Sequence, residues 1–336
     1  MALGLAPSRA VSAHNRVMDE LFMLHDDGVF LRREALEFGY DDRSLREAVR
    51  AGVLAKVRHG AYVSAAVWSE ADATKRHWLR CCAVLRSHPP GAVALSHTSA
   101  CVDHSVDLYR PALTKVHVLR LDGGVGRNLG DVTYHAGGWS ASDVEEVEGR
   151  LRTALPRAAV EAALLGTTEQ GKVVLDSALR RDDACLDRLG ELARMMLTWP
   201  GGQRLQVAAR LARPGAGSVG ESLTDFLFWT ERIPRPELQF EVCDAFGQVV
   251  AVLDFAWPEY GVFGEFDGKV KYGRLLKPGD DVTQVVVREK EREDLVRELT
   301  NFLGIRFIWS DLRERRRTGH RVRAKLAQGR TARRAA

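Results

Sequence analysis

The chain has 336 residues, of which 45% are hydrophobic and 28% are charged, and its formal net charge is +4. This length and composition are typical of a soluble globular protein with two or three domains. No apolar run approaches the roughly 18 residues of a membrane span, and the first twenty residues lack the apolar core of a signal peptide. We therefore expect a cytoplasmic protein without a membrane partner.

The five cysteines fit a reducing compartment. Their number is odd, and their spacing matches neither a disulfide framework nor a paired metal-binding motif. We expect reduced thiols that serve mainly in packing. They are Cys81, Cys82, Cys101, Cys185 and Cys243.

The first region, residues 1–70, predicts three helices followed by a hairpin. Apolar residues recur at helical spacing over Val17–Leu24, and shorter helices are expected at Arg32–Phe38 and Arg43–Ala51. Residues 53–57 and 61–63 then form a two-stranded hairpin. This order is typical of a winged helix-turn-helix.

The third predicted helix has one basic face. Asp41 or Asp42 caps it, and the apolar residues Leu45, Ala48 and Val49 lie opposite the basic ones. In a helix-turn-helix this helix enters the DNA major groove, and the hairpin reaches the phosphates. An ordinary solvated helix face is the alternative. The candidate DNA-binding residues are Arg43, Arg46, Arg50, Lys56 and Arg58.

The run GVFLRREALEFGYDDRSLREAVRAGVLAKVRHGAYV, Gly28–Val63, resembles the N-terminal winged helix of AbiEi-type antitoxins of type IV toxin–antitoxin systems. The shared features are a glycine after each helix, the arginines of the third helix and a wing of the form V-x-x-G-x-Y. The later stretch ALSHTSACVDHSVDL extends the resemblance to about the first 135 residues. It implies sequence-specific DNA binding, usually as an autorepressor, and a cognate toxin as a possible partner. Protein contact by the winged helix is the alternative.

The middle region, residues 71–212, predicts a mixture of helices and strands. Helices are expected at 75–87 and 96–101, strands at 115–119 and 132–135, and helix again from Asp143 through 158–165 and 171–196. No pair of histidines has metal-ligand spacing, so satisfied or surface side chains are expected. Those of this region are His97, His104, His117 and His135.

The third region, residues 213–328, follows a Pro- and Gly-containing linker at 213–217. Gln248–Ala256 predicts an apolar strand with Asp254 near its end, and 262–267 predicts the return strand. Glu265 and Asp267 are two apart on that strand and so share a face. Because burying carboxylates among apolar residues is costly without a cation, this hairpin indicates a metal site. Carboxylate oxygens suit Mg²⁺, which activates water for phosphodiester hydrolysis.

The segments VLDFAWPEYGVFGEFDGKVKYG and REKEREDLVRELTNFLGIRFIWSDL resemble the very-short-patch-repair-like endonuclease domain, a PD-(D/E)XK or restriction endonuclease-like fold. The resemblance covers about 110 residues and implies Mg²⁺ ligands at Asp254, Glu265 and Asp267, with Glu221 upstream. Glu221 also fits a capping box with Ser218. The family often has lysine where Asp267 stands, and Lys269 or Lys271 could supply that positive charge.

The end of the chain is basic. From Arg313 onward there are ten lysines or arginines and one acidic residue, which favours a polyanion partner or a solvated terminus. Before it, 307–309 predicts a buried strand, and Asp311 is expected to cap the last helix. The acidic and basic residues Glu291, Arg292 and Asp294 are interpreted as a solvated helix face rather than a catalytic group.

The sequence thus predicts an α+β protein: a winged helix-turn-helix, a mixed α/β middle region, a PD-(D/E)XK nuclease-like α/β domain and a basic tail at 329–336. The first hypothesis is a DNA-binding protein that hydrolyses phosphodiesters with Mg²⁺, with Asp254, Glu265, Asp267 and Lys269 as catalytic residues. The alternative is a non-catalytic, antitoxin-like transcriptional regulator that keeps the nuclease fold for binding.

Overall fold

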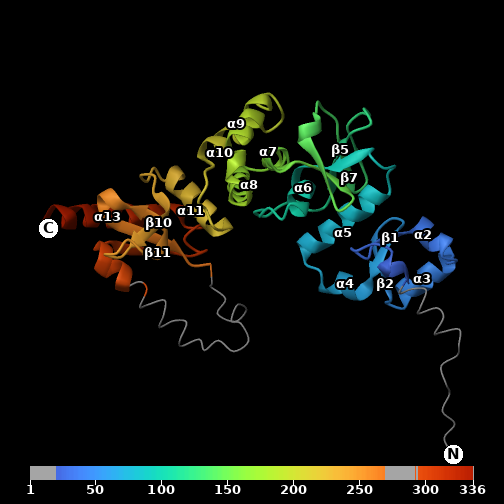
Figure 1. Cartoon of the computed structure of the whole chain (residues 1–336), viewed down its shortest axis with the longest axis horizontal. Coiled ribbons are helices and arrows are strands. Elements are labelled where there is room, and N and C mark those ends of the chain that lie inside the picture. Colours follow the sequence, from blue (N-terminus) through green and yellow to red (C-terminus); the bar gives the residue numbers. More distant parts are fainter. Residues whose placement is uncertain (1–19, 269–291, 293, 336) are drawn as a thin grey trace, which may run out of the picture. The chain divides into compact units, whose positions relative to one another are not determined.

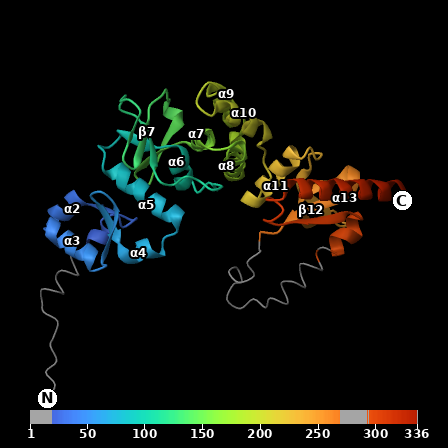
Figure 2. The same cartoon turned by 180° about the vertical axis from the view of Figure 1, so that it is seen from behind.

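The structure is a computed structural model that describes residues 20–268, 292 and 294–335. It contains two compact units, the first formed by 1–106 and 110–162 and the second by 107–109 and 163–336. Figure 1 and the view from behind in Figure 2 run from the first unit in blue and green to the second in yellow and red. No described helix is long and apolar enough to cross a membrane.

The first unit begins with a small helical and stranded part. Its three-stranded sheet has the order β1-β3-β2, and buried residues of α2, α3 and β1 share one core cluster. The second and third predicted helices and the hairpin are confirmed, and of the first predicted helix the described residues 20–23 are helical. The elements are β1 (Phe30–Leu31), α2 (Arg32–Glu37), α3 (Asp42–Arg50), β2 (Leu54–Arg58), β3 (Ala61–Ser64) and α4 (Ala65–Glu70).

Local signals explain this part. Asp41 is the N-cap of α3, and its side chain accepts a 2.7 Å hydrogen bond from the amide of Ser44. The hairpin turns at Gly60, whose φ of +71° is a conformation that glycine adopts without strain. Leu45 and Ala48 are the buried residues on the inner side of α3.

The rest of the first unit is built on a six-stranded sheet of order β6-β7-β5-β4-β9-β8. Within it β5 runs parallel to β7, and β4 runs parallel to β9. The elements are α5 (Ala73–Arg86), β4 (Val93–Leu95), α6 (His97–Asp103), β5 (Val116–Arg120), β6 (Arg127–Leu129), β7 (Val132–His135), η1 (Ala141–Asp143), β8 (Val144–Val147), β9 (Arg150–Thr153) and α7 (Leu155–Leu165).

The predicted return to helix at Asp143 is wrong. Residues 144–153 form the hairpin of β8 and β9, and helix begins only at Leu155. The turn is made by Glu148 and Gly149, which both have positive φ, at +51° and +72°. Two such residues in succession suit the tight turn of a hairpin and break a helix.

The second unit contains four helices ahead of a sheet, and a long helix at its end. The predicted single helix over 171–196 is wrong, because Asp182 accepts a hydrogen bond from the amide of Ala184 and starts a separate turn. The elements are α8 (Thr168–Arg181), η2 (Asp183–Cys185), α9 (Leu186–Met195), α10 (Gly202–Leu211), α11 (Val219–Thr230), β10 (Glu237–Cys243), β11 (Val249–Trp257), η3 (Pro258–Tyr260), β12 (Val262–Phe266), β13 (Leu303–Phe307) and α13 (Arg315–Ala335).

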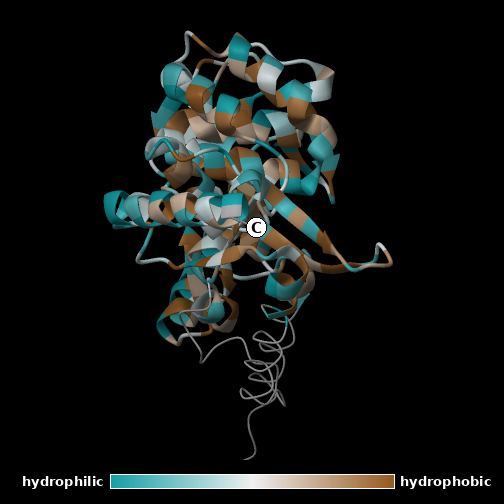
Figure 3. Ribbon diagram, turned by 90° about the vertical axis from the view of Figure 1, so that its left-hand side faces the viewer, coloured by the Kyte–Doolittle hydropathy of each residue, from teal (hydrophilic) through white to brown (hydrophobic). Residues whose placement is uncertain are grey.

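The sheet of the second unit has the order β10-β11-β12-β13. The first three strands are antiparallel neighbours, and β13 returns parallel to β12. Side chains of α11 and α13 share one core cluster with the sheet, where the ring of Phe228 meets Phe255, Trp257 and Phe307 edge to face. Figure 3 shows apolar and polar residues mixed along the helices, as one buried side requires.

Three expectations for this unit need correction. The last strand ends at Phe307, and Asp311 accepts from the amide of Ile308 instead of capping α13, which begins at Arg315. The expected linker at 213–217 is anchored, because Arg213 pairs with Asp225. The expectation that the last helix carries the basic residues of the tail is confirmed, because α13 continues as far as residue 335.

Candidate functional sites

The basic face of α3 is exposed. Arg43, Arg46 and Arg50 are all solvent-exposed, while Leu45 and Ala48 on the opposite side are buried. Arg43 pairs with Glu47 one turn along the helix at 2.9 Å, a surface contact that solvent screens. The side chains that the sequence singled out therefore form one accessible face.

The two basic residues of the hairpin differ in their surroundings. Lys56 is exposed on β2. Arg58 is held inside the first unit, since its guanidinium donates to both carboxylate oxygens of Asp131 at 2.9 and 3.0 Å and to Ser87. Arg58 thus ties the hairpin to the six-stranded sheet, and Lys56 is the residue of this pair that is accessible to a ligand.

The carboxylates of the second unit come from α11, β11 and β12. Asp254 on β11 accepts a 2.7 Å hydrogen bond from the amide of Phe266 on the neighbouring strand. Ser218 caps α11 by accepting from the amide of Glu221, and the Glu221 carboxylate accepts from the amide of Gly217 at 2.7 Å and the hydroxyl of Ser218 at 2.8 Å, where the predicted capping box has it accept from the Ser218 amide.

The electrostatics link these carboxylates. Burial, and then the charge of Glu221, raise the pKa of Asp254 to about 6. Burial also raises the pKa of Glu265, although the guanidinium of Arg292 opposes that shift. Arg292 donates to Glu265, so it pairs with a carboxylate of this group instead of lying on a solvated helix face. Asp254 and Glu265 are half-buried carboxyls with raised pKa values, which is the character of a cation site.

In the described residues, these carboxylates do not form a preformed metal-binding site. No three carboxylate ligand atoms there lie within 4.8 Å of one another. Asp267 faces Arg306, whose guanidinium nitrogen is 3.6 Å from its carboxylate. Lys269 and Lys271 lie outside the described residues, as does Glu291.

One residue near Asp254 was missed by the sequence analysis. Gln239 donates to Glu221 at 3.2 Å and also bonds the Asp254 carboxyl, and its φ of +50° is unusual for a side-chain-bearing residue. Such local strain gathers at functional sites. The sequence carried no signal for it, because the strand β10 was not predicted.

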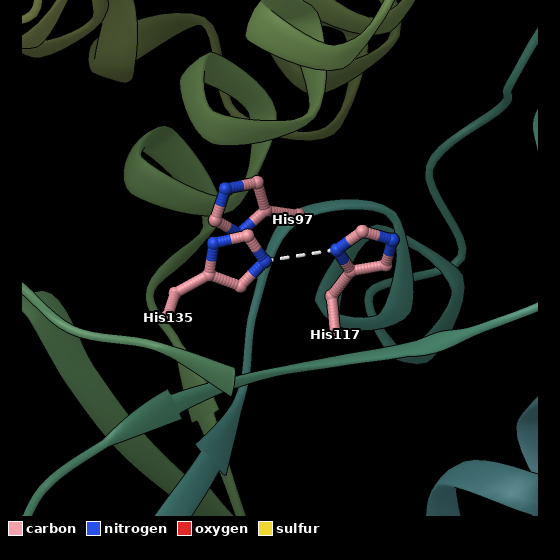
Figure 4. Close-up of side chains that lie close together, drawn as sticks. All are labelled: His97, His117 and His135. Carbon is pink, nitrogen blue, oxygen red and sulfur yellow. Dashed lines mark hydrogen bonds between the residues drawn. The ribbon is translucent and has the colours of Figure 1, made fainter. Parts of the chain in front are cut away.

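Three of the histidines expected to be satisfied or surface side chains form a group in the first unit. One ring nitrogen from each of His97, His117 and His135 lies within 4.8 Å of the others, the one group of this kind among the described residues. Figure 4 shows the His97 ring stacked on that of His135, with His117 beside it. The sequence signal for this group was the alternation of side-chain direction along β5 and β7, which places His117 and His135 on one face of the sheet.

Comparisons with known proteins bear on the N-terminal region. The family model described as "Transcriptional regulator, AbiEi antitoxin" matches residues 16–65, which supports the resemblance predicted there. Two uncharacterized proteins of Mycobacterium tuberculosis, from strains CDC 1551 and H37Rv, are each 27% identical over 167 residues, covering 45% of this chain. The chain spans 60% of the length of these curated relatives.

Proposed function

We propose that this protein is a DNA-binding transcriptional regulator of the antitoxin type. The observation that carries the proposal is the exposed arginine face of α3, which lies within the segment matched by the regulator family. Arginine binds guanine edges and phosphates through two nitrogens at once, and a capped helix preceding a hairpin is the usual carrier of such contacts. The winged helix-turn-helix is the fold that this proposal assigns to residues 20–70.

The two sides of α3 have different roles. The apolar side chains of α3 pack in the core, and the side chain of Asp41 caps its N-terminus. The three arginines are not needed for either role, so their common face is available to a polyanion. Lys56 on the hairpin would add a phosphate contact, whereas Arg58 would serve to hold the hairpin in place.

The test is binding to a duplex that spans the DNA upstream of the gene, measured by fluorescence anisotropy. Arg46→Ala is expected to weaken binding about 10- to 100-fold if it contacts a base edge, from the roughly 1–3 kcal/mol of such a contact. Arg204→Ala is the matched control, since Arg204 is an exposed arginine on a helix of the other unit. Equal affinity of the two variants would contradict the proposal.

A second candidate function is metal-dependent phosphodiester hydrolysis by the second unit. It is supported by the raised pKa of Asp254 beside Glu221, and by the element order α11-β10-β11-β12-β13 with the last two strands parallel. In this proposal Glu221, Asp254, Glu265 and Asp267 would hold Mg²⁺, and a bound water would attack the phosphate. The pairing of Asp267 with Arg306 makes the regulator the better supported function.

The proposed partners follow from the same reasoning. DNA is the ligand of the α3 face, and a cognate toxin protein is the partner that an antitoxin-type regulator would have. The basic helix α13 offers a second polyanion-binding surface on the other unit.

A further inference from the structure

The six-stranded sheet brings three histidines together at one end. His97 is the first residue of α6 and is separated from β4 by Ser96, while His117 and His135 lie on the parallel neighbours β5 and β7. The register pairs Leu119 with His135 and His117 with Thr133, so the two strand histidines point to the same face. The amide of Ser96 donates to the carbonyl of His117, which fixes the start of α6 beside β5.

The three imidazoles are close and mutually ordered. Nδ1 of His117 and Nε2 of His135 are 2.9 Å apart, and the ring centroids of His97 and His135 are 3.7 Å apart (Figure 4). In a tetrahedral zinc site with bonds of about 2.0–2.1 Å, ligand nitrogens lie about 3.3 Å apart. Nitrogens already within 4.8 Å need shifts of about an ångström to reach such a site, with the stacked rings turning so that their lone pairs meet.

The group is buried in a way that keeps the rings neutral. His97 is 4% exposed, and His117 and His135 are half-buried, which leaves an approach from solvent. Burial, together with repulsion between neighbouring rings, lowers the pKa of His117 to about 3, and burial lowers that of His135 to about 4. Neutral imidazole is the form that binds a metal ion, so at neutral pH no proton has to leave first.

A carboxylate stands behind His97. Oε2 of Glu161 lies 3.5 Å from Nδ1 of His97, and Glu161 is 1% exposed and bonded to the buried Arg157. A carboxylate that contacts the ring of a ligating histidine is the usual partner in zinc sites, where it orients the imidazole and increases its basicity. His97 also has a φ of +50°, a backbone strain that packing must offset and that gathers at functional positions.

Two other histidines of this unit, His77 and His88, have protein partners at both ring nitrogens. His77 bonds the hydroxyl of Ser99 and the carbonyl of Leu113, and His88 bonds the hydroxyl of Tyr134. Those rings have both nitrogens engaged by protein groups, as structural histidines do. The three clustered rings instead stack on one another, with Nδ1 of His97 also 3.1 Å from the hydroxyl of Ser96.

We propose that His97, His117 and His135 bind a single Zn²⁺ ion, with Glu161 positioning His97 and the fourth coordination position open to water. Three imidazole nitrogens around one ion are a ligand set that zinc uses in proteins, and they disfavour the oxygen-seeking Mg²⁺ and Ca²⁺. The site lies in the same unit as the α3 arginine face but does not depend on DNA binding.

The experiment uses the full chain without a histidine tag, stripped with chelator and dialysed. Titration with Zn²⁺ by calorimetry is expected to give one ion per chain, and Co²⁺ is expected to give the visible absorption of a tetrahedral site. The double variant His117→Gln/His135→Gln should bind Zn²⁺ at least tenfold more weakly, whereas His88→Gln, a half-buried control in the same unit, should bind as the wild type does.

Two further readouts keep the test decisive if the double variant unfolds. X-ray absorption of the zinc-loaded wild type should show nitrogen and oxygen ligands with imidazole scattering, and zinc should raise the melting temperature of the wild type. Binding of no stoichiometric ion, or a zinc site with sulfur ligands from the cysteines, would overturn the proposal. So would equal zinc affinity in a folded double variant.

Discussion

Nζ of Lys172 on α8 lies 3.0 Å from Oδ2 of Asp225 on α11, in the interior of the second unit. The same ammonium group contacts Asp176 at 2.5 Å, and Arg213 contacts the other oxygen of Asp225 at 2.6 Å. Lys172 is 1% exposed, so this group of charges is screened little by water. These ion pairs therefore join α8, Arg213 in the expected linker, and α11.

Replacing Lys172 tests the contribution of these buried ion pairs. Lys172→Met leaves Asp176 without its ammonium partner, and an uncompensated buried charge costs about 3–5 kcal/mol of unfolding free energy. Urea denaturation followed by tryptophan fluorescence measures the loss. Lys172→Met/Asp176→Asn removes both charges and is expected to recover part of it. A single variant as stable as the wild type would show that the ions contribute nothing.

The close packing of α11 on the sheet depends on Gly220, which has no side chain. A Cβ added to Gly220 would lie 2.0 Å from the ring of Phe266, so Gly220→Ala forces a shift that we expect to cost about 1–3 kcal/mol. Gly190→Ala on α9 is the control, because its Cβ would meet only the end of Arg194 at 3.5 Å. Alanine there should stabilise the helix by up to about 1 kcal/mol. Stabilisation by both substitutions would contradict this packing.

The carboxyl of Asp254 predicts a pH-dependent stability. Its folded pKa of about 6 lies above the ordinary value of 3.8, so between these values the folded chain holds a proton that the unfolded chain releases. Above pH 6 the charged group destabilises the fold. In EDTA, Asp254→Asn should raise the unfolding free energy at pH 8 by on the order of 1–3 kcal/mol, because each pKa unit corresponds to about 1.4 kcal/mol.

The gain should shrink as the pH falls through 6 and disappear below about 4, where the wild-type carboxyl is protonated as well. Glu241→Gln is the control, since Glu241 is exposed on the same sheet and should show no such trend. A gain that does not change with pH would mean that the charge of Asp254 is not the cause.

Metal-dependent cleavage is tested with supercoiled DNA and Mg²⁺ or Mn²⁺, against EDTA. If the second candidate function holds, nicking requires the metal and is lost in Asp254→Ala, while DNA affinity stays within about threefold of the wild type. Glu241→Ala should nick as the wild type does. Nicking that survives in Asp254→Ala would remove the carboxylates from the reaction, and no nicking in the wild type would leave regulation as the function.

The fold was predictable where one local signal decided the structure. The cap at Asp41 and the glycine at Gly60 set α3 and the hairpin, and the apolar run before Asp254 set β11. The hairpin at Glu148–Gly149 was missed because its turn lacks the usual Asn-Gly or Asp-Gly pair.

The sites were predictable only in part, since they depend on which strands become neighbours. Asp254 and Glu265 share one hairpin, so their proximity follows from a short connection. His117 and His135 meet through the parallel pairing of β5 and β7, with β6 and its turns between them along the chain. Spacing along the chain carries no information about such a contact, and His97 joins it from the start of a helix.

The α3 arginine face is the centre of the proposed function, and the salt dependence of DNA binding tests it most directly. Each phosphate contact contributes about 0.9 to the slope of log affinity against log salt concentration. We expect Arg43→Gln/Arg46→Gln/Arg50→Gln to lose at least tenfold in affinity for the upstream duplex and to reduce that slope by about 1–3. An unchanged affinity and slope in the folded triple variant would place the DNA-binding surface elsewhere and contradict the account.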